Sequence, residues 1–141
     1  MNRGGICGLA FGLLVAGFAW GEIEQKQIGA SLPDVTGKWA GTWGAYPEAK
    51  EKPAMPMDCL VVRTEGGWRA TFEGECGRPY KYTIQMDGRQ VGDAVMFKGS
   101  VDLGEKDGGV YDWIGRATGQ EFIGFYTSEK HAGVFRLTRK K

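Results

Sequence analysis

The chain of 141 residues contains a single histidine, His131, and a single asparagine, Asn2. A catalytic set of nucleophile, histidine and acid would therefore depend on His131, which lies in a polar turn where a solvated histidine is the ordinary case. Asn2 offers no site for an Asn-linked glycan. No glycine-rich phosphate motif opens a helix. We therefore expect a protein that is not an enzyme.

Excess charge of one sign is also missing, since the formal net charge is +1. Proteins that bind nucleic acid neutralise phosphates with clustered cations, so this balance argues against nucleic acid as a partner. The four basic residues among the last six are typical of a solvated tail. No carboxylate pair or metal-ligand spacing stands out, and we expect no cofactor.

The longest apolar run, residues 6–20, is shorter than the roughly 20 residues that a membrane-spanning helix needs. It follows Arg3 and precedes the small residues Ala19 and Gly21, which is the layout of a secretory signal peptide. We expect residues 1–21 to be a cleaved signal, with an uncleaved anchor as the alternative, and the mature protein to be periplasmic or secreted with no transmembrane segment. Residues 22–36 have no hydrophobic period and are expected to form a flexible leader, followed by one domain over 37–141.

What the sequence does contain is a repeated alternation of apolar and polar residues, which indicates β-strands with one buried face. The predicted strands are 38–44, 58–64, 68–76, 80–87, 95–103, 111–118, 121–127 and 133–139. Strands 58–64 and 121–127 are apolar on both faces, so their facing stays open. Pro56 is assigned to the first loop, and Asp87–Gly88 to a turn.

Short turns join most of these strands, which favours antiparallel pairing of neighbours. We predict an all-β fold, an eight-stranded antiparallel up-and-down barrel, with a two-sheet β-sandwich as the alternative. Glycines at the strand centres fit the kinks of a small barrel. The pair Cys59 and Cys76 in an exported protein predicts a disulfide.

Gly37-Lys38-Trp39 at the start of the first strand resembles the Gly-x-Trp motif of lipocalins. Arg139 near the end of the last strand is similar to the basic residue that closes the barrel in the wider calycin superfamily. The resemblance implies that Arg139 packs over Trp39 at a closed end. The openings Thr36-Gly37-Lys38-Trp39 and Gly41-Thr42-Trp43 also resemble uncharacterised small exported bacterial proteins.

Four predicted connections, 45–57, 77–79, 104–109 and 128–132, meet at the end opposite the leader. We call that end the mouth. Inward aromatic side chains near it suit a flat or apolar small molecule. These candidate ligand-binding residues are Trp43, Phe72, Tyr82, Tyr111 and Tyr126, with Trp113 deeper. The alternative is that the aromatic side chains fill the barrel and leave no cavity.

Three functional hypotheses follow. The first is a non-catalytic exported barrel that binds a small apolar or aromatic ligand at the mouth. The second is a protein-interaction or inhibitor module with a packed interior. The third and weakest is copper handling, because thioether, thiol and imidazole groups suit copper. Its ligands would be Met55, Met57, Cys59, Cys76 and His131.

Overall fold

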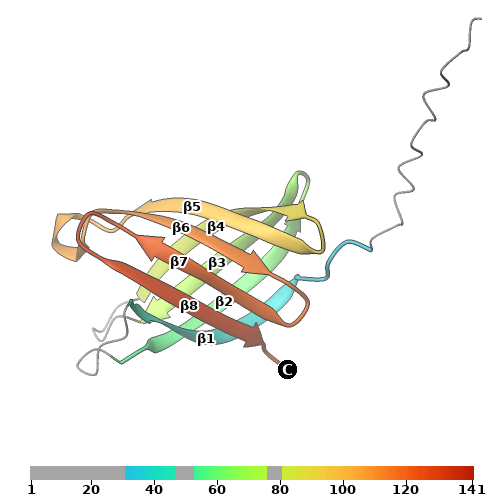
Figure 1. The fold of residues 1–141 in the computed structure, drawn as a ribbon, viewed down its shortest axis with the longest axis horizontal. Helices are drawn as coiled ribbons and strands as arrows, with labels where there is room; N and C mark the ends of the chain where they lie inside the picture. Colours follow the sequence, from blue (N-terminus) through green and yellow to red (C-terminus); the bar gives the residue numbers. More distant parts are fainter. Residues whose placement is uncertain (1–30, 47–52, 76–80) are drawn as a thin grey trace, which may run out of the picture.

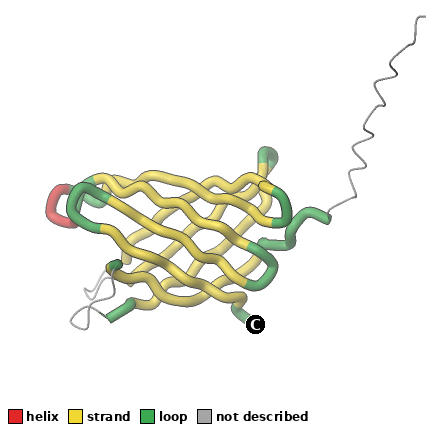
Figure 2. Tube along the Cα trace, in the orientation of Figure 1, coloured by secondary structure: helices red, strands yellow, loops and turns green. Residues whose placement is uncertain are grey.

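The computed structural model describes residues 31–46, 53–75 and 81–141, which form one antiparallel barrel (Figures 1 and 2). Its strands are β1 (Gly37–Ala45), β2 (Met55–Thr64), β3 (Gly67–Glu75), β4 (Lys81–Val91), β5 (Ala94–Asp102), β6 (Val110–Ala117), β7 (Glu121–Thr127) and β8 (Ala132–Arg139). A single 3-10 turn, η1 (Glu105–Asp107), lies between β5 and β6. The predicted signal, residues 1–21, lies outside the described residues.

Each strand pairs with its neighbour in the sequence, and β1 pairs with β8 to close the barrel. The closing register runs from Trp39 opposite Arg139 to Ala45 opposite Gly133. The predicted up-and-down barrel is therefore confirmed, and the alternative β-sandwich is not formed. Within the described ranges, no helix is long and apolar enough to cross a membrane.

Successive side chains of each strand point alternately into and out of the barrel. In β6 the inward residues are Tyr111, Trp113, Gly115 and Ala117, as the sequence predicts. The structure also settles the two strands that are apolar on both faces. Met57, Cys59 and Val61 of β2 point inward, as do Phe122, Gly124 and Tyr126 of β7.

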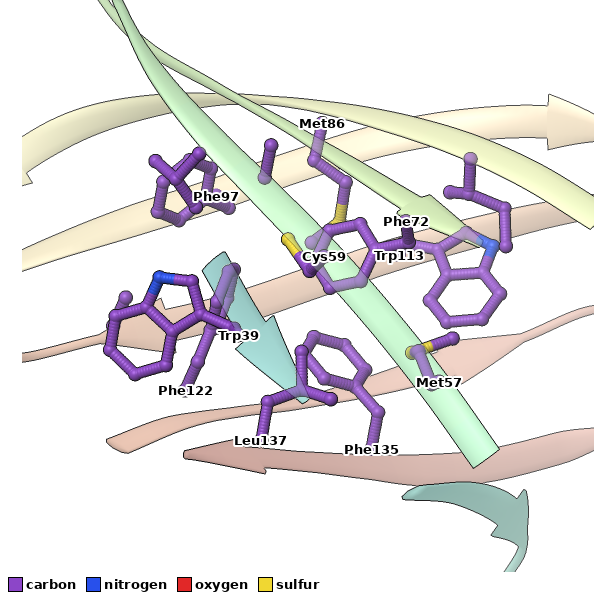
Figure 3. Close-up of a cluster of buried hydrophobic side chains, with 14 of the residues drawn as sticks. Trp39, Met57, Cys59, Phe72, Met86, Phe97, Trp113, Phe122, Phe135 and Leu137 are labelled. Atoms are coloured by element: carbon purple, nitrogen blue, oxygen red, sulfur yellow. The ribbon is translucent and has the colours of Figure 1, made fainter. Parts of the chain in front are cut away.

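Aromatic rings in the core lie against glycines of neighbouring strands. A Cβ added to Gly124 would lie 2.4 Å from Cζ of Phe135, and one on Gly88 would lie 2.5 Å from Cε1 of Phe97. Real side chains do not approach so closely, so these positions admit only glycine without repacking. The resulting core includes tilted and edge-on ring pairs, such as Phe72 with Phe135 at 5.3 Å between centroids (Figure 3).

Two predicted boundaries are wrong. β2 begins at Met55, so Pro56 lies inside a strand, opposite Thr42. Pro56 has no backbone N–H to donate. It is tolerated because the pairing of β2 with β3 begins only at the next residue, Met57. The predicted turn at Asp87–Gly88 is instead part of β4, and the chain reverses at Gly92, whose φ is +63°.

The closed end is built around Trp39, as the calycin resemblance implies. The guanidinium carbon of Arg139 lies 4.9 Å from the centroid of the Trp39 ring. Arg139 also donates hydrogen bonds to the carbonyl oxygens of Asp34, Thr36 and Gly119. The indole N–H of Trp39 donates to the carbonyl of Val35 at 3.0 Å. Because Val35 is fully buried, the end of the predicted leader is part of the packed structure.

Candidate functional site

The mouth is formed by segments that the topology brings to the end opposite the C-terminus (Figure 1). Residues 103–109, including η1, connect β5 to β6, and residues 128–131 connect β7 to β8. The first of these loops is held by a backbone hydrogen bond from Leu103 to Gly109 at 3.0 Å. The second is held by one from Ser128 to His131 at 2.7 Å. Each of these two loops is thus closed by a backbone hydrogen bond.

A pocket of about 170 Å³ lies at the mouth. Its walls come from β1, β2, β6, β7 and β8, and its lining residues are Trp43, Gly44, Ala45, Pro53, Met55, Tyr111, Tyr126, His131 and Ala132. A dry apolar cavity of about 150 Å³ can hold one benzene molecule. The volume therefore suits a single ring or a group of similar size.

The pocket is open because its three aromatic walls lie back on glycines. A Cβ on Gly133 would be 2.1 Å from the Tyr126 hydroxyl oxygen, and one on Gly74 would be 3.1 Å from Nε1 of Trp43. Tyr111 lies over Gly108, where a Cβ would be 2.4 Å from its hydroxyl oxygen. Each ring occupies the space that a side chain on its neighbour would need, which leaves the middle of the mouth open.

Hydrogen bonds fix two of these three rings. The Trp43 indole N–H donates to the carbonyl of Glu75 at 2.9 Å, and the Tyr111 hydroxyl donates to the carbonyl of Asp107 at 2.9 Å. His131 stacks on Tyr111 with an angle of 9° between the rings and is exposed at the rim. These contacts prearrange the site before any ligand enters.

The third ring, Tyr126, differs because its hydroxyl has no hydrogen-bond partner among the described residues. The side chain is only 6% exposed. Burial, with a smaller effect of Tyr111, raises the pKa of Tyr126 to about 12. The hydroxyl therefore keeps its proton over the whole physiological range.

The floor of the pocket is closed by packed rings. Trp113 stacks on Tyr126 with 4.6 Å between centroids and lies 5.9 Å from Phe135. In Figure 3, Trp113 and Trp39 stand at opposite ends of the cluster, and the Trp113 nitrogen faces away from Trp39. That nitrogen is buried and has no hydrogen-bond partner in the described structure. A ligand at the mouth is thus limited in depth by Tyr126 and Trp113.

The structure supports part of the predicted aromatic set. Trp43, Tyr111 and Tyr126 line the pocket, and Trp113 lies beneath them, as predicted. The ring of Tyr82 contacts that of Trp43 at 6.4 Å between centroids without lining the pocket.

Phe72 is a wrong prediction for the mouth. It is fully buried and contacts Phe122 and Phe135 in the core. It lies opposite Cys59, which in turn faces Trp39 of the closed end, so it is too far along the barrel to reach the pocket.

Sequence reasoning missed Gly133 as part of the site, although a signal was present. The β7–β8 hairpin places Gly133 opposite Tyr126. A glycine on the inward face of a strand, opposite an inward tyrosine, indicates a ring lying flat against the backbone.

The copper hypothesis is not supported by the arrangement. Met55 and His131 do share the mouth pocket. Met57 and Cys59, however, are buried and lie successively farther from the mouth, because every two residues along β2 cover about 6.6 Å. Cys76 lies outside the described residues. Among those that are described, no group of three or more His, Cys, Asp or Glu side chains could hold a metal ion.

The predicted disulfide is not supported either, since Cys59 is a free, buried cysteine. Burial strongly raises the pKa of its thiol, an effect that outweighs the hydrogen bond from the backbone of Thr71. Its predicted partner, Cys76, lies outside the described residues. The thiol of Cys59 therefore behaves as part of the core.

A larger groove of about 500 Å³ runs over the outside of the barrel, across β7, β8 and β1. Its lining includes Tyr46, Phe125, Val134 and Arg136. Phe125 is 59% exposed and lies between Ile114 of β6, which is 52% exposed, and Val134 of β8. These three side chains form an apolar row across three neighbouring strands.

No protein-family model matches this chain, and no curated protein is significantly similar to it. The function must therefore be argued from the geometry of the barrel itself.

Proposed function

We propose that this protein is a non-catalytic, calycin-like binding barrel that takes a small apolar or aromatic molecule into its mouth. The observation that carries the proposal is the pocket of about 170 Å³ walled by Trp43, Tyr111 and Tyr126. Ligand sites are typically concave, largely apolar and preformed, with a few polar groups. All three features are present at the mouth.

Packing sets the size of the proposed ligand. Trp113 and the phenylalanines beneath it fill the barrel, so the interior offers no long channel for an extended chain along the described core. A ligand with one ring, or one ring of a larger molecule that projects outward, fits the available depth. Larger fused rings should bind more weakly.

The test is a titration of the isotope-labelled protein with ethylbenzene, followed through the tryptophan indole N–H resonances. We expect saturable shifts at Trp43, which lines the pocket, and none at Trp39 or Trp68, which are buried near the other end. The absence of saturable shifts at Trp43 with a panel of single-ring compounds would exclude this function.

A blocking variant sharpens the test. Ala45 lines the pocket on the inward face of β1, opposite Gly133, so Ala45→Trp should fill the mouth. We expect this variant to abolish the Trp43 shifts. The matched control is Lys38→Trp, on the same strand but exposed near the closed end, which should bind as the wild type does.

Export is part of the proposal. The signal-like residues 1–21 support cleavage after Gly21 and release to the periplasm or the exterior. The intact mass of the protein from the exported fraction tests this directly. Retention of residues 1–21 would contradict it.

A second candidate function, a protein-interaction module, is favoured by the outer groove. A contiguous apolar patch on the surface of a monomer often marks an interaction site, and the exposed Ile114 and Phe125 continue onto the half-buried Val134. If this face binds a protein, a partner recovered from the exported fraction by the wild type should be lost with Phe125→Glu. Equal recovery by both proteins would argue against this role.

A further inference from the structure

Two side chains of the mouth pocket have polar atoms that bond to no described residue, the hydroxyl of Tyr126 inside the pocket and the imidazole of His131 at its exposed rim. The other two aromatic side chains with polar atoms, Trp43 and Tyr111, are already bonded to backbone carbonyls. Among the described residues, the only fully buried side-chain nitrogen or oxygen without a partner is Nε1 of Trp113, so the unpartnered hydroxyl of Tyr126 is accessible at the surface of the pocket that Tyr126 lines. Tyr126 is 6% exposed and lines the pocket.

The position of the hydroxyl is built into the sheet. Tyr126 lies opposite Gly133, and the absence of a side chain there lets the ring lie against β8. The ring of Trp113 stacks on the ring of Tyr126 and so restrains the orientation of the tyrosine. The hydroxyl is therefore held in place at the pocket wall by rigid strands.

We propose that the ligand of the mouth is a neutral, single-ring molecule carrying a hydrogen-bond acceptor, which receives the hydroxyl proton of Tyr126. This inference rests on the proposed binding function and adds the polar anchor and the ligand class. A phenol hydroxyl is a better donor than acceptor because its ring withdraws the oxygen lone pair. A carbonyl oxygen attached to an aromatic ring meets the requirement.

Neutrality follows from the pocket lining, which includes no lysine, arginine, aspartate or glutamate and whose one basic side chain, His131, lies at the exposed rim. An anionic or cationic ligand would lose hydration without gaining an opposite charge. Aromatic walls can attract a quaternary ammonium group through their ring faces, which is the principal competing ligand class. The donor at Tyr126 favours an acceptor over such a cation.

The test compares acetophenone with ethylbenzene, which has the same ring and nearly the same shape but no acceptor. Both are titrated into the wild type and Tyr126→Phe, with the Trp43 indole resonance as the readout. We expect the variant to weaken acetophenone binding about three- to tenfold, the effect of one net hydrogen bond. Ethylbenzene affinity should change less than twofold.

Tyr111→Phe is the matched control, because it removes a hydroxyl in the same pocket that is already bonded to Asp107. It should leave the ratio of the two affinities unchanged. Tetramethylammonium is titrated in parallel.

The outcomes separate the two claims. If ethylbenzene binds saturably but acetophenone is insensitive to Tyr126→Phe, the anchor is refuted and the binding function stands. If tetramethylammonium binds and neither neutral ligand does, the neutral ligand class is refuted. If none of the three binds, both the anchor and the proposed function fail.

Discussion

At the scale of single residues, the barrel depends on pairing each large inward ring with a glycine on an adjacent strand. Tyr126 with Gly133 at the mouth and Phe135 with Gly124 in the core are two examples. The rings gain close packing against backbone, while the glycines avoid overlap. The same device both fills the core and keeps the mouth pocket open.

The burial of Tyr126 should make the stability of the fold sensitive to alkali. Its pKa is raised to about 12 in the folded state, against about 10 in an unfolded chain. Below pH 10 both states keep the proton. Between pH 10 and 12 the unfolded state loses it while the native state holds it, so the free energy of unfolding falls as pH rises. The contribution is roughly 2–3 kcal/mol.

Urea unfolding of the wild type and Tyr126→Phe between pH 8 and 11.5 measures this effect. Above pH 10 we expect the free energy of unfolding to fall more steeply with pH for the wild type than for the variant. Below pH 10 the two pH dependences should be the same. Identical pH profiles for both proteins would show that this hydroxyl is not shielded from solvent as the structure has it.

At the scale of strands, alternation in the sequence was enough to place most of the fold. It predicted the inward face of β6 and of β3 because one face is clearly apolar and the other polar. It could not orient β2 or β7, because the outward residues Leu60 and Phe125 are also apolar. Facing in such strands is decided by register with the neighbours, which is a tertiary property.

The site was predictable to a similar degree. Trp43, Tyr111 and Tyr126 could be assigned to the mouth because each lies near the strand end that meets the mouth loops. Phe72 could not be excluded from sequence, because its depth depends on how the strands are staggered around the barrel. The sequence could not predict that the pocket is open either, because this depends on how the rings of Tyr111 and Tyr126 lie on Gly108 and Gly133.

The closed end joins the first and last strands, and Arg139 is expected to stabilise this junction. Arg139→Ala removes hydrogen bonds to Asp34, Thr36 and Gly119 together with the contact to Trp39. We expect a loss of about 1–3 kcal/mol in the free energy of unfolding, measured by urea denaturation.

Arg136→Ala is the control for this change. Arg136 lies on the same strand and faces outward, and its side chain makes no hydrogen bond or ion pair with a described residue. Its replacement should change stability by less than about 0.5 kcal/mol. Equal effects of the two substitutions would mean that Arg139 contributes only its charge.

At the scale of the whole molecule, closure gives every strand two hydrogen-bonded neighbours. A barrel of this kind has no edge strand that can detach by itself. Residues on the inside of β2 are covered by β1 on one side and β3 on the other. Access to the core should therefore require a large part of the barrel to open at once.

Cys59 reports on such opening, because its thiol is buried on the inside of β2 and its pKa is raised by that burial. In a Cys76→Ser variant lacking residues 1–21, Cys59 is the only cysteine. We expect iodoacetamide to label it only through global unfolding. The labelling rate should then rise with urea along the same slope as the equilibrium unfolding curve.

The control is Leu60→Cys in a chain that also carries Cys59→Ser and Cys76→Ser. Leu60 is 47% exposed, so this cysteine should react at the rate of a free thiol. Labelling of Cys59 that is independent of urea would reveal a local opening of β2 against β1 or β3. In the protein that retains Cys76, absence of labelling after full unfolding without reductant would instead show that the two cysteines are joined.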